Sequence, residues 1–230
     1  ARAARLAALS GGGRAGAMIS ARDWAGTPLG PVEAWPEPLV TVVGLMLNAR
    51  QPMFVVWGPD RTLLYNDAYA EILANKHPDA MGRPFEAVWP EIWESDLAPI
   101  VARAYAGEAI HMDDIPLLML RRGYPERTHF SFSYTPIRAD GAVAGFFCPC
   151  VETTAQVFRQ ARERFRADMA ERLRDVRSPE VVLEQVAELL GRHLGVDTVG
   201  FSEADAAGEA VAVVGEWRSG RVESVRGGHA

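Results

Sequence analysis

The hydrophobic positions of the chain form short strand-like runs before residue 66 and after residue 108. Two apolar runs, MFVVW and TLLY, flank the turn sequence GPDR and predict a β-hairpin. Three further runs, within residues 109–122, 127–137 and 142–152, are separated by RGYPE and by RADGA, whose Asp-Gly pair is typical of a tight turn. Because these connections are short, we expect the three runs to be antiparallel neighbours.

Between these two groups the hydrophobic spacing becomes helical. Asn66 and Asp67 are good helix-capping residues, and the stretch DAYAEILANK has apolar residues at helical intervals. The stretch SDLAPIVARAYAGE predicts a longer helix that ends near Gly107. The order of elements predicts an α+β fold: a five-stranded antiparallel sheet with short helices on one face and a cavity between helices and sheet.

A long amphipathic helix is predicted for residues 154–177. One of its stripes is apolar, with intervals of 3, 4, 4, 4 and 3 residues, whereas its other faces are rich in arginine and acidic residues. The stripe consists of Phe158, Ala161, Phe165, Met169, Leu173 and Val176. A single free helix would expose this stripe to water. We therefore expect a homodimer in which Phe158, Phe165, Met169 and Leu173 lie on the dimer helix.

The pattern divides the chain into four segments. Residues 1–17 are small and glycine-rich and are expected to be a flexible leader, and residues 18–153 are expected to form the sheet domain. The helix of residues 154–177 is the linker. Residues 178–230 begin with Ser-Pro, which suits a helix start, and continue into a predicted hairpin, so they are expected to be the incomplete beginning of a second α/β unit.

Composition narrows the classes of function. A net charge of −6 and a pI near 5.4 argue against a nucleic-acid partner, which needs a basic face. The longest apolar run, residues 38–47, is too short for a membrane span of about 20 residues. Lys76 is the only lysine, which makes lysine-based covalent chemistry a weak candidate. Two cysteines are too few for a disulfide scaffold, so a reducing, cytoplasmic location is expected.

The two cysteines, Cys148 and Cys150, lie one residue apart in the last predicted strand. Side chains at i and i+2 point the same way with Cβ atoms about 6.5 Å apart, whereas a disulfide needs about 4 Å. Zinc needs four ligands, and only His111 and His129 on adjacent strands offer a mixed set. Packing in the core, with the thiols facing the cavity, is the favoured interpretation, and no metal site is predicted.

His111 and Asp113 share one face of a predicted strand, as acid–base chemistry would require. No nucleophile, base and oxyanion donor can be named together, however. We therefore predict no catalytic residue in this part of the protein. The aromatic residues of the strands are candidates for a cavity wall or simply for the core.

Residues 53–93, MFVVWGPDRTLLYNDAYAEILANKHPDAMGRPFEAVWPEIW, resemble the PAS sensor domains of bacterial signalling proteins. In that family the second strand ends in an asparagine that starts the first helix, as Asn66 does, at the mouth of the pocket. The last strand commonly closes on an acid–aliphatic–threonine triplet. Here the matching place holds Glu152, Thr153 and Thr154, which departs from the pattern by having threonine in the middle.

Two further stretches carry resemblances. The upstream DWAGTPLGPVEAWPEPL is similar to a subgroup found at the N-terminus of sensor histidine kinases. The stretch VVLEQVAELLGRHLGVDTVGFSEAD resembles the opening helix and strand of a GAF domain. Together they imply the sensory input region of a cytoplasmic histidine kinase, with a downstream output domain in the same chain. Glu152, Thr153 and Thr154 would transmit the signal into the helix.

The resemblance also implies a ligand-binding cavity. The residues predicted to line it are Trp57, Asn66, Tyr69, His111, Tyr134, Cys148 and Cys150. No cofactor is predicted, and an unknown small ligand is allowed. The alternatives are a sensor loaded with haem or flavin, or the input region of a phosphatase or a cyclase. The chain lacks the Asn-Cys-Arg motif of the flavin-binding branch, and His77, which precedes a proline, fits a loop better than a haem ligand.

Overall fold

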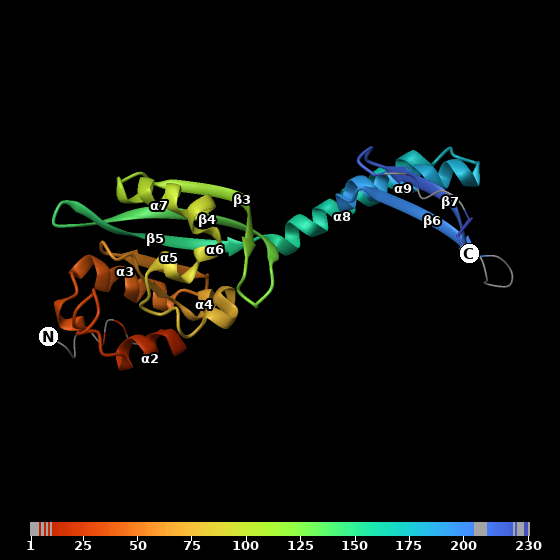
Figure 1. The fold of residues 1–230 in the computed structure, drawn as a ribbon. Coiled ribbons are helices and arrows are strands. Elements are labelled where there is room, and N and C mark those ends of the chain that lie inside the picture. Colours follow the sequence, from red (N-terminus) through yellow and green to blue (C-terminus); the bar gives the residue numbers. More distant parts are fainter. Residues whose placement is uncertain are drawn as a thin grey trace. The chain divides into compact units, whose positions relative to one another are not determined.

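The computed structural model describes residues 5, 7, 9, 11–204, 211–222, 224 and 228–229. The chain divides into two units, residues 1–157 and residues 158–230, which we describe separately. Figure 1 shows the ribbon of both units. None of the described helices combines the length and the apolar character needed to cross a membrane.

The first unit is built on one five-stranded antiparallel sheet, as predicted. Its strand order is β2-β1-β5-β4-β3, so the last strand of this unit, β5, lies at the centre of the sheet. Phe54 on β1 pairs with Cys148 on β5, and Phe132 on β4 pairs with Cys150. The strands are β1 (Met53–Trp57), β2 (Thr62–Tyr65), β3 (Ile110–Met119), β4 (Glu126–Ala139) and β5 (Ala142–Glu152).

Short helices connect β2 to β3 and pack against the sheet, as Figure 1 shows for α4, α5, α6 and α7. The first of them starts at Asn66, whose side chain accepts a hydrogen bond from the backbone N–H of Tyr69. They are α4 (Asp67–Leu73), η2 (Ala74–Lys76), α5 (Phe85–Val88), α6 (Pro90–Ile92), the π-helical turn η3 (Trp93–Leu97) and α7 (Ala98–Tyr105).

The other face of the β1–β2 hairpin is also covered. Val55 and Trp57 alternate with Phe54, which points toward the helices named above, yet both are buried. The element that contacts β1 and β2 from this side is α3 (Glu37–Asn48), which follows the short η1 (Val32–Ala34). The hairpin therefore lacks the polar alternation of a half-exposed strand because both of its faces are packed.

The N-terminal segment is helical from Gly13, so α2 (Gly13–Ala21) begins inside the segment expected to be a flexible leader. The carboxylate of Asp67 accepts hydrogen bonds from the backbone N–H groups of Arg14 (2.9 Å) and Ala15 (2.6 Å). A Cβ on Gly13 would lie 2.0 Å from this carboxylate, and the positive φ of Gly13 (+60°) also favours glycine. Ala15 and Ile19 are buried. Asp67, which the sequence offers as a cap for its own helix, thus caps α2.

The long helix α8 (Thr154–Leu173) follows β5 directly and ends four residues before the predicted boundary at 177. In the second unit α9 (Pro179–Leu194) packs on a sheet of order β6-β7-β8. A Cβ on Gly191 of α9 would lie 2.1 Å from the ring of Trp217, so this close packing requires glycine. The strands are β6 (Thr198–Ala204), β7 (Val211–Arg218) and β8 (Gly228–His229).

Candidate functional site

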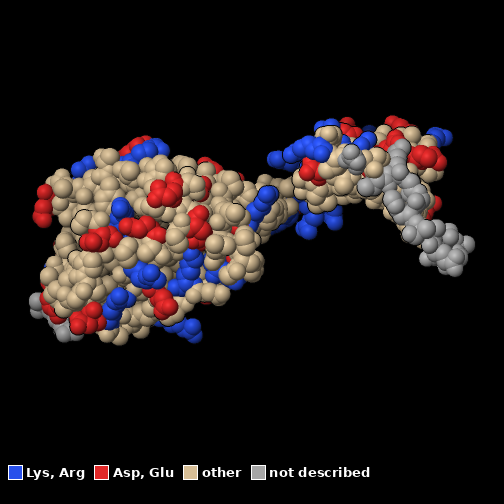
Figure 2. Space-filling view, viewed as in Figure 1, with Lys and Arg blue, Asp and Glu red and all other residues tan. Residues whose placement is uncertain are grey.

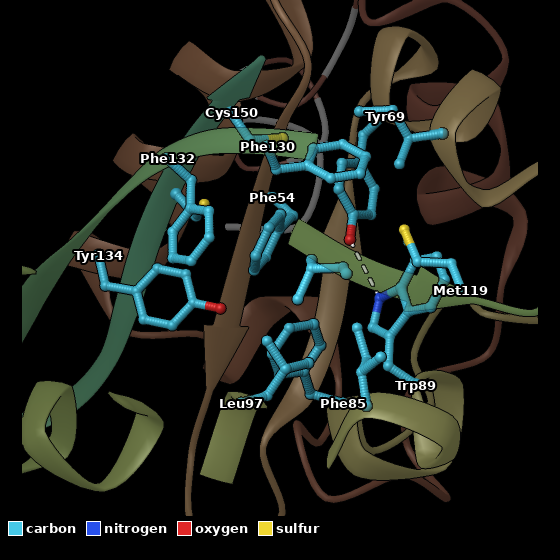
Figure 3. Close-up of a pocket in the computed structure, with 14 residues that line it drawn as sticks. Phe54, Tyr69, Phe85, Trp89, Leu97, Met119, Phe130, Phe132, Tyr134 and Cys150 are labelled. Atoms are coloured by element: carbon cyan, nitrogen blue, oxygen red, sulfur yellow. Dashed lines mark hydrogen bonds between the residues drawn. The ribbon is translucent and has the colours of Figure 1, made fainter. Parts of the chain in front are cut away.

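The sheet and the helices α4 to α6 enclose a small cavity in the first unit (Figure 3). Its volume is about 40 Å³. Leu97 of the lining belongs to η3, a π-helical turn of the kind that is rare in proteins and frequent at functional sites. The lining residues are Phe54, Tyr69, Ile72, Phe85, Trp89, Ile92, Leu97, Leu117, Met119, Phe130, Phe132, Tyr134, Cys148 and Cys150.

The alternation of side chains along each strand places the lining residues of the sheet on one face. Every second residue of a strand points to the same face, so Cys148 and Cys150 of β5 share the cavity face. On the neighbouring strand β4, Phe130, Phe132 and Tyr134 also face the cavity. Phe54 of β1 completes this layer. The rings then pack closely: the centroids of Phe54 and Tyr69 are 4.8 Å apart, and those of Phe132 and Tyr134 are 5.0 Å apart.

The few polar atoms in the wall are uncharged. The hydroxyl of Tyr69 accepts a hydrogen bond of 3.1 Å from Nε1 of Trp89, drawn as a dashed line in Figure 3. Burial raises the pKa of Tyr69, Tyr134 and Cys148 well above their ordinary values, and each has a thiol neighbour that raises it further. Among the described residues, no lysine, arginine, histidine or carboxylate lines the cavity. The site therefore favours small neutral molecules.

The size of the cavity bears on the cofactor alternatives. A cavity of about 150 Å³ is needed to hold one benzene ring. This one is several times smaller because aromatic side chains fill the space. A flavin or a haem does not fit the cavity in this form.

Four of the seven predicted cavity residues lie together in its wall: Tyr69, Tyr134, Cys148 and Cys150. The other three lie elsewhere. Trp57 is on the opposite face of β1, because its position alternates with Phe54 and Val56. The sequence did not identify Phe54 and Phe85 as cavity residues. Their place in the cavity wall follows only from the strand register and the helix packing.

Asn66 is buried beside the cavity, but its side chain does not face it. Its Oδ1 accepts hydrogen bonds from the N–H groups of Met53 (3.1 Å) and Tyr69 (3.0 Å). Its Nδ2 donates to the carbonyls of Met46, Ala49 and Gln51 at 2.8–3.2 Å. Both polar atoms of the Asn66 side chain are thus hydrogen-bonded to backbone groups. Asn66 connects α3, the loop after it, β1 and α4, and it has no polar atom left to bind a ligand.

His111 lies on the exposed face of β3, away from the cavity. Its Nδ1 is 2.7 Å from Oγ of Ser133 and its Nε2 is 3.1 Å from Oδ1 of Asp113. The imidazole and the carboxylate are both well exposed. Serine, histidine and aspartate do meet here, but on an open sheet surface.

The predicted transmission residues sit at a polar junction where β5 becomes α8. The guanidinium of Arg121 donates two hydrogen bonds, of 2.8 and 2.9 Å, to the carboxylate of Glu152. Oγ1 of Thr154 donates to the same carboxylate at 3.0 Å and accepts from the N–H of His129 at 2.9 Å. The N–H of Thr153 donates to the His129 carbonyl at 2.8 Å. The start of α8 is thus tied to β4 and to Arg121.

Arg121 is the member of this junction that the sequence did not reveal. It follows β3 in a turn rich in charge, where an arginine is normally solvated, yet its side chain is only 3% exposed. It also donates to the Ile72 carbonyl of α4 at 3.4 Å, and its own carbonyl accepts from the N–H of Asn75. Burial alone would raise the pKa of Glu152, but the hydrogen bonds and charge of Arg121 lower it below its usual value.

The predicted dimer residues lie along α8. Phe158 is 52% exposed, and Met169 and Leu173 are half-buried. Phe165 stacks on His193 of α9 with ring centroids 4.3 Å apart. Within the second unit, α9 therefore covers part of the stripe.

The single lysine has a structural role. Nζ of Lys76 donates to the Val88 carbonyl at 2.6 Å and to both carboxylate oxygens of Glu91 at 2.9 Å, and it lies 4.4 Å from the ring centre of Trp89. These contacts leave no free amine for covalent chemistry. Among the described residues, no group of three or more histidine, cysteine or acidic side chains is arranged to hold a metal ion.

This fold and cavity define a small α+β domain with an aromatic interior. Residues 47–157, just under half of the chain, match the family described as PAS fold. A comparison with curated proteins found no match to the chain.

Solved structures give weaker likenesses. An RNA-binding light-oxygen-voltage receptor is similar with a TM-score of 0.41 and 18% identity over 56% of this chain, and the chain spans 36% of that structure. The chromophore-binding domain of a Stigmatella aurantiaca phytochrome gives a TM-score of 0.31 and 18% identity over 76% of this chain, which spans 55% of that domain.

Proposed function

We propose that this chain is the non-catalytic sensory input region of a cytoplasmic bacterial signalling protein whose output domain is a histidine kinase. In this proposal the PAS domain receives a signal in its aromatic cavity. The junction of Arg121, Glu152 and Thr154 passes the resulting change into α8. A dimer formed through α8 carries it to the unit that begins at residue 178, which we assign to the start of a GAF-like domain.

The observation that carries this proposal is the continuity of one strand face. Cys148, Cys150 and Glu152 occupy alternate positions of β5, so the face that lines the cavity leads directly to the carboxylate at the start of α8. A shift of β5 inside the cavity would move this carboxylate relative to Arg121.

A second path reaches the same arginine. Ile72 of α4 lines the cavity with its side chain, while its carbonyl accepts a hydrogen bond from Arg121. Both the sheet wall and the helix wall of the cavity therefore contact one guanidinium. A ligand that favours one spacing of the two walls supplies the state-dependent interaction that a relay requires.

The surface agrees with a protein partner rather than a nucleic acid. On the face seen in Figure 2, acidic and basic side chains of the first unit are interspersed. The chain as a whole carries a net charge of −6. Such a surface gives no basic stripe for phosphates to follow. The half-exposed ring of Phe158 instead offers an apolar contact for the same helix of a second copy.

Light scattering on the purified chain tests the dimer. We expect a dimer for the wild type and a monomer for Phe158→Glu, because a carboxylate would have to be buried in the helix interface. Phe158 is preferable to Phe165 as the test position because the contact between Phe165 and His193 is then left intact. The matched control is Arg159→Glu on the neighbouring exposed position, which should remain dimeric. A wild-type monomer, or equal loss of dimer in both variants, would contradict the proposal.

A further inference from the structure

The two cysteines form a pair of free thiols inside the cavity. Cys148 is fully buried, Cys150 is 4% exposed, and both line the same wall. The two side chains occupy alternate positions of β5 and so face the same cavity. Figure 3 shows Cys150 at one end of the cavity, with the hydroxyl of Tyr134 directed toward the interior. This arrangement places two soft donors in an otherwise apolar chamber.

The strand keeps these thiols from joining directly. Their backbones are two residues apart on β5 and face the same way, so the Cβ separation is about 6.5 Å. A disulfide requires roughly 4 Å between Cβ atoms. A third atom bonded to both sulfurs can bridge this gap without moving the strand. The pair is therefore better suited to hold a bridging atom than to act as a redox couple.

The surroundings restrict which bridging atom fits. A zinc ion wants four ligands, and the cavity wall supplies two thiols and no histidine or carboxylate. Copper(I) prefers thiolates, but two thiolates around one monovalent cation leave a net negative charge. The described part of the chain places no cationic side chain in the cavity wall to balance it, and burying such a charge is costly. The bridged product should therefore be neutral.

We propose that Cys148 and Cys150 form a binding site for a small, neutral, thiol-seeking oxoacid of trivalent arsenic. Arsenous acid, As(OH)3, would condense with the two S–H groups to give (Cys–S)2As–OH and two water molecules. Two As–O and two S–H bonds break, and two As–S and two O–H bonds form. Arsenic stays trivalent, no electron is transferred and no charge is created.

Shape and volume agree with this chemistry. Trivalent arsenic is pyramidal and holds its two sulfur atoms closer together than a linear two-coordinate ion would, which suits two thiols at alternate positions of one strand. A water molecule needs about 10–15 Å³ of such space, so a cavity of about 40 Å³ has room for the As–OH group that remains after two water molecules leave. The hydroxyl left on arsenic would face the phenol of Tyr134.

This inference names a ligand class for the cavity of the proposed function, and its signalling consequence rests on that function. Bonding both thiols would fix the orientation of two side chains of β5 that lie just before Glu152. Binding itself is measured without any signalling readout, so a failed relay and a failed site can be told apart.

The test uses the full chain and sodium arsenite at neutral pH. Native mass spectrometry should show one arsenic per chain, with both thiols lost to a thiol reagent applied after unfolding, and the melting temperature should rise. Cys148→Ser and Cys150→Ser should each abolish the adduct, because one thiol gives no chelate. Met112→Leu, which removes a sulfur atom of β3 outside the cavity wall, is the matched control and should bind like the wild type.

Circular dichroism of each variant checks folding, and Cys→Ala variants replace any serine variant that fails to fold. Wild-type-like binding by a single-cysteine variant would overturn the proposal. Arsenic bound only after the chain is unfolded in urea would overturn it too, because the site requires the folded cavity.

Discussion

Two strand-to-helix junctions in the first unit differ in how their polar groups are satisfied. At the first, β2 passes into α4 at Asn66, and at the second, β5 passes into α8 at Glu152 to Thr154. Both bury polar side chains that connect several elements. The first uses a neutral amide whose partners are all backbone atoms, whereas the second uses an ion pair between side chains.

The Asn66 junction is saturated. The side chain is 1% exposed and makes five hydrogen bonds, two as acceptor and three as donor. A side-chain amide has little further capacity. Any movement of α3, β1 or α4 relative to the others would break one of these bonds, so this junction is built to hold.

The Glu152 junction is not saturated. Nε of Arg121 and Oε1 of Glu126 are buried and lie 3.5 Å apart, too far for a good hydrogen bond, and Oγ1 of Thr153 has no partner among the described residues. A small rotation of Arg121 can therefore exchange one carboxylate for another. The difference indicates that the domain is anchored at one junction and adjustable at the other.

The largest expected effect comes from breaking the saturated junction. Asn66→Ala removes five hydrogen bonds to backbone groups of α3, the loop after it, β1 and α4, so we expect a loss of about 3 kcal/mol in the free energy of unfolding. Urea unfolding followed by tryptophan fluorescence measures it. Asn75→Ala, at an exposed asparagine near the end of the same helical segment, should change stability by less than about 0.5 kcal/mol. A loss no larger than that of one helix cap, about 1 kcal/mol, would show that Asn66 is only a cap.

The sequence predicts much of this architecture because its signals are local. Turn residues mark the ends of the five strands, and the polar alternation of β4 identifies its buried face, including Tyr134. The same reasoning fails for Trp57, since the hairpin is apolar on both faces and its alternation disappears. The role of Asn66 is hidden because three of its partners belong to a helix end and loop 15 to 20 residues earlier in the chain.

A bulge explains why β3 is the hardest strand to interpret from the sequence. Its register shifts between Met112 and Ile115, and Asp114 has a positive φ of 49°. In a regular strand, Met112 and Ile115 would face opposite sides because they are three positions apart. The extra residue of the bulge places Ile115 on the same inner face as Ile110 and Met112. Arg121 is equally hidden, since nothing near it in the sequence separates a buried arginine from a solvated one.

A smaller effect is expected at the adjustable junction. Glu152→Gln keeps the shape of the side chain but removes its charge, leaving Arg121 with Glu126 alone. Breaking a buried ion pair costs 3–5 kcal/mol when both partners are buried. Because the Glu152 side chain is 29% exposed, we expect about 2 kcal/mol. Glu163→Gln on the exposed side of α8 is the control and should have no measurable effect.

The pH dependence of this difference has a definite sign. The pKa of Glu152 is lowered in the folded protein, so its contribution is fully present above the ordinary glutamate pKa of about 4.5. It is lost as the pH falls through the lower, folded-state pKa. The stabilities of the wild type and Glu152→Gln should therefore converge below about pH 4.5. A gap that stays constant from neutral pH into acid would mean that the charge of Glu152 does not contribute.

The smallest expected effect is the difference in stability between variants of two adjacent threonines, Thr153 and Thr154. Thr154→Val removes the hydroxyl that accepts from His129 and donates to Glu152, and should cost about 1 kcal/mol. Thr153→Val makes the same chemical change at a buried hydroxyl with no partner among the described residues, so it should be neutral or stabilising. Urea unfolding of the two variants side by side measures the contrast. Equal losses would show that the hydroxyls act only through the helix start. A loss at Thr154 alone would place the polar coupling between sheet and α8 at that residue, where the signal would have to cross.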